Sequence, residues 1–266
     1  MVYILVHDTT TLVLNHNNRI KNNRIEKWMA SCLVFGATGA TGRAVVQELL
    51  SGRSDVGRVI TIGRRGIDDD VKSTLDGTRL EEVVVESLDC LKGRDGHDTI
   101  AENVKERVLA QGPVDIAYCC LGTTRGVAGS ADAFRKVDVE YVDISASFAK
   151  SCGVKVFGLI SAQGASKTIW ASDWKPFHGL LYTKCKGLAE ECVLKQGFRS
   201  TILMRPGLLD REESARFGER MFRGILPTIK TRDLARVMIN QSMLAQQEPV
   251  KIFEMKEIQR QSRQNE

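Results

Sequence analysis

Short apolar runs, many of them rich in β-branched residues, alternate with segments of helical period from residue 31 onward. The apolar runs predict strands at residues 32–36, 58–63, 81–87, 114–120, 155–161, 200–207 and 250–255. The segments between them predict helices at residues 41–52, 97–110, 131–152, 179–196 and 231–246. Strands that alternate with helices at this spacing are typical of βαβ units. We therefore expect an α/β fold, built as a doubly wound and mostly parallel sheet with helices on both faces.

The two ends of the chain depart from this alternation. Residues 1–30 centre on "NHNNRIKNN", an asparagine-rich stretch that cannot bury enough apolar surface to offset the entropy of ordering. We expect residues 1–30 to be a disordered extension, residues 31–258 to be the folded domain, and residues 259–266 to be a polar tail. Residues 208–230 also break the alternation, and they predict a small cap on the substrate side of the domain.

Composition excludes several classes of protein. A hydrophobic content of 42% and a charged content of 27% are ordinary for a globular domain. The net charge of +5 is spread along the chain without a dense basic run, so we expect no nucleic-acid partner. No stretch approaches the roughly 18 consecutive apolar residues of a membrane span. The seven cysteines contain no CxxC pair and the four histidines are scattered, so we expect no metal site, and free thiols predict a cytoplasmic location with the nucleus as an alternative.

The glycine-rich stretch "GATGATG" lies between the first predicted strand and the first predicted helix. In this position Gly36 permits a tight turn, Gly39 lets the backbone approach a pyrophosphate, and Gly42 permits close packing of helix on strand. The N–H groups and the dipole at the start of the helix then attract the anion. The alternative is a glycine-rich turn that binds nothing. The pattern favours a dinucleotide cofactor.

The end of the second predicted strand indicates which nicotinamide cofactor is bound. Enzymes that use NAD usually carry an acidic residue there, which accepts a hydrogen bond from the ribose 2′-OH. This chain instead reads "TIGRRG", which places Arg64 and Arg65 at that position. Planar guanidinium groups pair well with a 2′-phosphate, so NADPH is the predicted cofactor. The alternative is a pair of surface arginines without a ligand.

The stretches "GATGATGR", "TIGRR", "CCLGTTRGVAG", "FRKVDVEYV" and "MRPG" together resemble those of the Tat-interacting-protein oxidoreductases. These proteins are an atypical branch of the short-chain dehydrogenase/reductase superfamily, and the resemblance covers about residues 31–258. It implies an NADPH-binding Rossmann domain with a Tyr-x-x-x-Lys pair, in a family associated with regulatory protein partners as well as redox activity. It also implies cofactor contacts at Thr38, Gly39, Ala40, Thr41, Arg64, Arg65, Leu121, Gly122 and Leu209.

The Tyr-x-x-x-Lys pair of that superfamily corresponds to "LLYTKCKG", which contains Tyr182 and Lys186. Residues four apart lie on one helix face, so Lys186 can stand beside Tyr182. Its ammonium group would lower the pKa of the phenol and also hold the ribose hydroxyls of the cofactor. Ser161 would complete the catalytic set by polarising the substrate carbonyl. Ala162 stands where many relatives place that serine, and the alternative is that Ser161 only caps its strand.

The linker from Ser161 to Tyr182 contains Trp170, Trp174, Phe177 and His178. These side chains form either a lid over the substrate or a surface-packed loop, and for His178 we favour the packing role. The resulting hypothesis is an NADPH-dependent oxidoreductase that reduces a small-molecule carbonyl substrate. The competing hypothesis is an NADPH-binding regulatory protein that acts through protein partners and turns over little or no substrate.

Overall fold

The computed structural model describes residues 2–4, 12–14, 18–21, 24–27, 29–73, 79–93, 99–174, 178–210, 228–244 and 248–264. Its centre is a seven-stranded sheet in the order β13-β10-β9-β8-β5-β6-β7, in which every pairing is parallel. In chain order the strands are β5 (Ala30–Phe35), β6 (Val56–Gly63), β7 (Leu80–Val84), β8 (Ile116–Cys119), β9 (Val156–Ile160), β10 (Ser200–Arg205) and β13 (Val250–Glu254). The predicted doubly wound α/β fold is confirmed.

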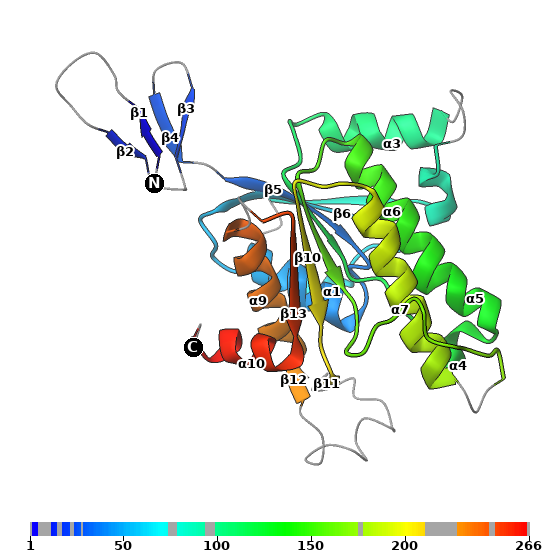
Figure 1. Cartoon of the computed structure of the whole chain (residues 1–266). Coiled ribbons are helices and arrows are strands. Elements are labelled where there is room, and N and C mark those ends of the chain that lie inside the picture. The colour runs from blue at the N-terminus through cyan, green and yellow to red at the C-terminus, as the bar shows by residue number, and fades with distance from the viewer. Residues whose placement is uncertain are drawn as a thin grey trace.

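Helices cover both faces of this sheet. In Figure 1, α3 (Thr99–Leu109), α6 (Tyr141–Ser151) and α7 (His178–Lys195) lie to the right of the sheet. The opposite face carries α1 (Ala40–Leu50) and α9 (Thr231–Leu244), which pack on each other and share one apolar core. Shorter helical segments are α2 (Asp69–Lys72), η2 (Leu88–Leu91), α4 (Arg125–Ala128) and α5 (Ala131–Arg135).

The strands read as continuous apolar runs because both of their faces are buried. Along β5, Cys32 and Val34 belong to the core beneath α1 and α9, whereas Leu33 and Phe35 belong to the core beneath α3, α6 and α7. Successive side chains of a strand point to opposite faces, so one short run supplies both cores.

The predicted helix at residues 131–152 is divided into three parts. A π-helical turn at Lys136–Glu140 separates α5 from α6. Such a wide turn keeps the hydrophobic pattern of a helix while shifting the side chains that follow it, so the periodicity did not reveal it. The turn carries Asp138, whose side chain is fully buried.

The order of the strands creates a crevice at the carboxyl ends of the two central strands, β5 and β8. The chain builds outward from β5 to β6 and β7 and then reverses to β8 on the other side of β5. At such a switch point the loops after the two central strands separate, and ligands of doubly wound proteins bind there. The loop after β5 contains the glycine-rich stretch, and the loop after β8 contains Leu121 and Gly122.

The segments at the two ends differ in their relation to the sheet. Strand β1 (Val2–Ile4) pairs with β2 (Leu12–Leu14), and β3 (Asn18–Lys21) pairs with β4 (Arg24–Lys27), in two small sheets separate from the large one. That residues 1–30 are a disordered extension stays a prediction, except that Ala30 already begins β5. The predicted polar tail is helical as far as Gln264, because α10 (Met255–Gln264) buries Met255 and Ile258 against the domain.

The predicted cap at residues 208–230 is described only at its ends. There β11 (Leu208–Asp210) pairs in parallel with β12 (Thr228–Lys230). Residues 211–227 lie outside the described residues, so the cap stays a prediction. Within the described part of the chain, none of the helices combines the length and apolar character needed to cross a bilayer.

All seven cysteines are free, and those in the sheet are deeply buried. Burial raises the pKa of Cys119 to about 12, and it raises the pKa of Cys120, which follows the same strand, still further. A thiol with so high a pKa is almost entirely protonated at neutral pH. Cys119 is fully buried and is therefore inert as a nucleophile while the domain is folded, whereas Cys120 is partly exposed.

Candidate active site

A cavity of about 680 Å³ opens at the carboxyl ends of the parallel strands. Segments that follow five of the seven strands of the sheet contribute to its wall, together with Asp138 and with Tyr182 and Lys186 from α7. The lining residues are 39–41, 120–124, Asp138, 160–163, Tyr182, Lys186, 206–209, Met255, Lys256 and Gln259. The cavity therefore spans the switch point and extends to the edge of the sheet at β13.

Most of the predicted site residues meet in this cavity. Those in its wall are Gly39, Ala40, Thr41, Leu121, Gly122, Ser161, Tyr182, Lys186 and Leu209. Those outside the wall are Gly36, Thr38, Gly42, Arg64 and Arg65. Asp138 is a wall residue that the sequence analysis missed.

The three glycines of the first loop differ in how much space each position leaves for a side chain. Gly36 adopts a left-handed conformation with φ +79°, and a β-carbon there would lie 2.9 Å from the carbonyl oxygen of Cys120. A β-carbon at Gly42 would overlap the carbonyl oxygen of Gly36, so α1 could not approach the strand. At Gly39 the nearest atom to such a carbon would be 3.5 Å away, an ordinary contact. Packing within the protein thus requires glycine at the first and third positions and leaves the middle one open toward the cavity.

The start of α1 lies in the cavity wall and has no side-chain cap. Gly39 is the N-cap residue and offers no side-chain cap, and no acidic side chain lies in the first turn. Ala40 and Thr41 follow in the cavity wall. Backbone N–H groups at such an end favour an anion, so these residues could hold a pyrophosphate.

Arg64 and Arg65 follow β6 and are exposed. Within the described residues, neither side chain forms an ion pair or a hydrogen bond. Arg43 of the first helix behaves differently, because it forms an ion pair with Asp68. Asp68 is the first acidic residue after β6 in the sequence. Because it is paired with Arg43, it is not an open acceptor for a ribose hydroxyl. This corner of the molecule therefore offers free guanidinium groups to a ligand.

Tyr182 and Lys186 lie on one face of α7, as predicted. The Lys186 Nζ atom is 5.9 Å from the centre of the Tyr182 ring and 2.9 Å from Asp138 Oδ1. Burial lowers the pKa of Lys186, but the nearby charge of Asp138 and the phenol of Tyr182 outweigh that effect and hold the pKa above its ordinary value. Lys186 is therefore a fixed positive charge beside the phenol.

Asp138 is held in place from two sides. Its Oδ1 atom faces Lys186, and its Oδ2 atom accepts a hydrogen bond of 2.9 Å from the backbone N–H of Thr123. The sequence did contain a signal for this residue. In a helix, Asp138 falls on the same face as Phe134 and Val142, which are both buried, and a carboxylate on an apolar face needs a partner.

Ser161 lies in the cavity wall, but its hydroxyl group is engaged elsewhere. The Ser161 Oγ atom donates a hydrogen bond of 2.5 Å to Glu190 Oε1, and both residues are buried. Glu190 in turn accepts hydrogen bonds of 2.9 Å and 2.6 Å from the guanidinium group of Arg205. A carboxylate only accepts, so the hydroxyl hydrogen of Ser161 points toward Glu190 and away from the cavity.

Among the described aromatic residues of the linker, Trp170, Trp174 and His178 do not line the cavity. His178 begins α7 and packs edge-on against Phe134 with 5.0 Å between ring centres, and burial lowers its pKa. Trp170 and Trp174 are 63% and 68% exposed, and Phe177 lies outside the described residues. The role of this loop as a lid stays a prediction.

The sequence is similar to one family of known proteins. A family model described as NAD(P)H-binding matches residues 36–243. The protein HTATIP2 of Rattus norvegicus is 37% identical over 202 residues, which are 74% of this chain and 72% of the rat protein. The protein FMP52, mitochondrial, of Candida albicans is 30% identical over 226 residues, which are 79% of this chain and 86% of the yeast protein.

Solved structures agree on the fold. The protein MoeE5, in complex with UDP-glucose and NAD, superposes with a TM-score of 0.59 at 15% identity, over 89% of this chain and 82% of that one. DesIV of Streptomyces venezuelae, a dTDP-glucose 4,6-dehydratase with NAD bound, superposes with a TM-score of 0.61 at 16% identity, over 85% and 75%. At such identities the likeness shows the Rossmann architecture and nothing about the substrate.

The relatives correct one expectation from the sequence. The FMP52 proteins of Lodderomyces elongisporus, Candida albicans and Emericella nidulans are named mitochondrial. The predicted cytoplasmic location, with the nucleus as an alternative, is therefore wrong. The prediction failed because free thiols and a mixed surface charge describe a reducing environment in general, and they do not distinguish between compartments.

Proposed function

Because the chain belongs to the atypical short-chain dehydrogenase/reductase family of the HTATIP2 and FMP52 proteins, we propose that it is an NADPH-dependent reductase of a carbonyl substrate. One observation carries this proposal. Tyr182 lies in the wall of the switch-point cavity beside Lys186, whose charge is held in place by Asp138. A tyrosine next to a buried cation is suited to proton transfer, because the cation stabilises the phenolate that remains.

The residues that would hold the cofactor follow its length along the crevice. Arg64 and Arg65 would bind the 2′-phosphate, and residues 39–41 the pyrophosphate. Leu121, Gly122 and Leu209 would lie against the nicotinamide half, and Lys186 would donate to its ribose hydroxyls. The open backbone at Gly39 fits the pyrophosphate, and the two exposed arginines, which have no partner among the described residues, fit the 2′-phosphate.

The chemistry divides between the cofactor and two side chains. NADPH, when bound, would supply the hydride for the carbonyl carbon. Tyr182 transfers its hydroxyl proton to the carbonyl oxygen, which completes the alcohol product. The phenolate left on Tyr182 lies beside the Lys186 ammonium group, whose charge stabilises it until solvent returns the proton. Asp138 holds Lys186 in position and does not touch the reacting atoms.

The location that we infer for the protein is the mitochondrion. This inference rests on the names of the FMP52 relatives. Imaging of the tagged full-length chain together with a mitochondrial marker tests it, and a uniform cytosolic signal would contradict it.

The Tyr182→Phe variant tests the enzymatic proposal. It removes the proton donor and keeps the ring, so turnover should fall by about 10²- to 10⁴-fold while NADPH affinity stays unchanged. The measurement is NADPH oxidation against a panel of aldehydes, ketones and quinones, with calorimetric titration of NADPH as the control. A fully active Tyr182→Phe variant would refute the mechanism.

A second candidate function is supported by the position of Ser161. Its hydroxyl hydrogen is directed at Glu190, so in this arrangement it cannot polarise a substrate carbonyl. This favours the alternative of an NADPH-binding regulatory protein that acts through protein partners. That function predicts no oxidation of NADPH by any member of the panel, with NADPH still binding and raising the thermal stability.

A further inference from the structure

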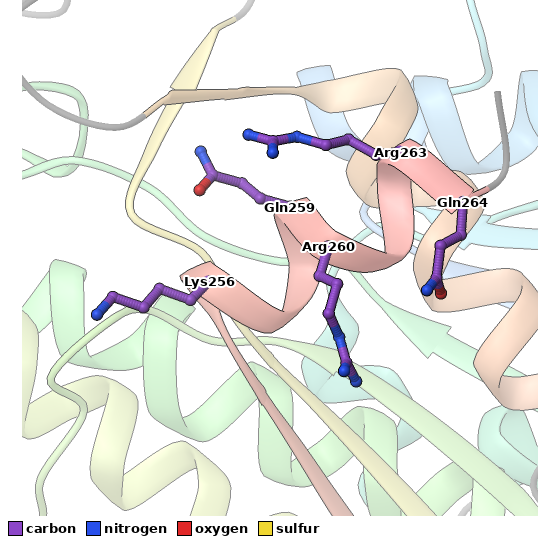
Figure 2. Close-up of a pocket in the computed structure, with 5 residues that line it drawn as sticks. All are labelled: Lys256, Gln259, Arg260, Arg263 and Gln264. Atoms are coloured by element: carbon purple, nitrogen blue, oxygen red, sulfur yellow. The ribbon is translucent and has the colours of Figure 1, made fainter.

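Helix α10 presents a cationic face, formed by Lys256, Gln259 and Arg263, beside the active-site cavity. These residues are spaced three and four apart, which places them on one side of a helix. Figure 2 shows the three side chains extending to the same side of α10, whereas Arg260 and Gln264 extend in other directions. All five border a hollow of about 410 Å³.

The hollow adjoins the proposed active site, with which it shares two lining residues. Lys256 and Gln259 line both the hollow and the cavity that contains Tyr182 and Lys186. The helix is anchored beneath them, because Met255 and Ile258 are 4% and 0% exposed. The Gln259 Nε2 atom also donates a hydrogen bond of 3.2 Å to the carbonyl oxygen of Thr228 in β12. The cationic face is thus fixed at the rim of the cavity.

The charges of the cationic face have no counter-ion among the residues that the structure describes. Arg260, on another side of the helix, forms an ion pair of 2.8 Å with Glu257. Over the part of the chain that the structure describes, neither Lys256 nor Arg263 has a carboxylate within ion-pair distance. All three residues of the face border the hollow. Two cations without a described counter-ion and a neutral amide donor at such a hollow favour an oxyanion.

The position along the sheet separates this face from the cofactor phosphates. The cofactor would run from the arginines after β6, across the loop after β5, to Tyr182. Helix α10 follows β13, the strand at the opposite edge of the sheet from β6 and β7. The pyrophosphate already has its own donors at residues 39–41, so an anion at the cationic face belongs to the substrate.

We propose that the cationic face binds a carboxylate or phosphate group of the substrate, so that the protein reduces an anionic carbonyl compound. This inference rests on the proposed reductase function and specifies its substrate class. The oxyanion lies against Lys256 and Arg263 with the Gln259 amide beside it, and the carbonyl group extends along the cavity toward Tyr182. A neutral carbonyl compound of the same shape lacks this attachment.

Matched acid and ester pairs test the proposal. The substrates are 4-carboxybenzaldehyde and 4-acetylbenzoate, each compared with its methyl ester in the presence of NADPH. The wild type should show a lower KM for the acids than for the esters. In the Lys256→Gln/Arg263→Gln variant, KM for the acids should rise at least about tenfold, because charge-assisted hydrogen bonds are lost, while KM for the esters stays the same.

A control variant, Lys105→Gln/Lys251→Gln, removes the same charge from positions that line neither the hollow nor the cavity and whose ion partners are Glu102 and Glu248. It should leave all four KM values unchanged. Equal KM values for acids and esters in the wild type, or an equal rise in both double variants, would overturn the anion site and leave the reductase intact. Loss of NADPH affinity in the Lys256→Gln/Arg263→Gln variant would assign the face to the cofactor and overturn it as well.

Calorimetric titration of 4-carboxybenzaldehyde into the protein with NADP⁺ separates the two proposals. Binding without turnover, lost only in the Lys256→Gln/Arg263→Gln variant, would support the anion site while the reductase proposal fails. The absence of any binding by the acid would overturn the anion site directly.

Discussion

Two ion pairs attach α7 to the rest of the domain one helical turn apart, and they differ in their surroundings. The pair between Lys186 and Asp138 is almost completely buried, with side chains 6% and 0% exposed. The pair between Glu190 and Arg205 is more open, at 7% and 21%, and Arg205 continues to the exposed Glu254. The first pair fixes a charge beside Tyr182, whereas the second fixes the hydroxyl group of Ser161.

This difference shows how burial determines what an ion pair can do. Away from water, a single lysine needs one dedicated carboxylate, because nothing else compensates its charge. The guanidinium group of Arg205 is partly exposed, so solvent compensates part of its charge. Its carboxylate partner can therefore also accept a hydrogen bond from a serine. Removing a partner should therefore cost much more at the first pair than at the second.

The largest effect is expected for Asp138→Ala. The substitution leaves Lys186 as an unpaired charge in the interior, so the free energy of unfolding should fall by about 3–5 kcal/mol. Denaturant unfolding of the apo protein measures this. The Asp138→Leu/Lys186→Met variant removes both charges and should recover most of the stability. An Asp138→Ala variant as stable as the wild type would show that water or another group compensates Lys186.

A smaller effect, on ligand binding alone, is expected for Arg64→Ala/Arg65→Ala. These cations are exposed and unpaired in the described part of the chain, in contrast to both ion pairs, so stability without cofactor should not change. Binding of NADPH should weaken by about 2–4 kcal/mol, and binding of NADH should not change. Calorimetric titration of both cofactors measures the difference. Equal affinity of the wild type for both would refute the selection of NADPH.

The smallest of the three effects is expected for Glu190→Gln. Arg205 keeps Glu254 and solvent as partners, so the free energy of unfolding should fall by about 1–3 kcal/mol. The glutamine oxygen can still accept from Ser161, so the serine stays in place. A loss as large as that of Asp138→Ala would contradict the comparison between the two pairs.

The sheet and the glycine loop could be predicted because their signals are local. Strands buried on both faces read as apolar runs, and the steric needs of Gly36 and Gly42 arise within one turn. The Tyr182–Lys186 pair could be located because the two residues share one helix. The ion-pair partners of Asp138 and Glu190 could not be predicted, because each residue pairs with a side chain from a different element. The apolar helix face around Asp138 indicates only that this carboxylate needs a partner, without identifying it.

Helix α10 was missed for a related reason. Its sequence is polar apart from Met255 and Ile258, and two apolar residues are too few to establish a helical period. The helix forms because those two side chains pack into an existing core. The function proposed for its cationic face depends on the neighbouring cavity. Residues far apart in the sequence form that cavity, so a local sequence pattern cannot reveal it.

The reaction of the neighbouring thiols of Cys119 and Cys120 with a labelling reagent can report on internal motion of the domain. Burial lowers the thiolate fraction of Cys119 by roughly a thousandfold at neutral pH, so a thiol reagent reacts with it only after the sheet opens. Cys120 borders the cavity, so its labelling also depends on whether a ligand covers it. Labelling rates at two adjacent positions therefore separate the opening of the whole domain from the emptying of its binding site.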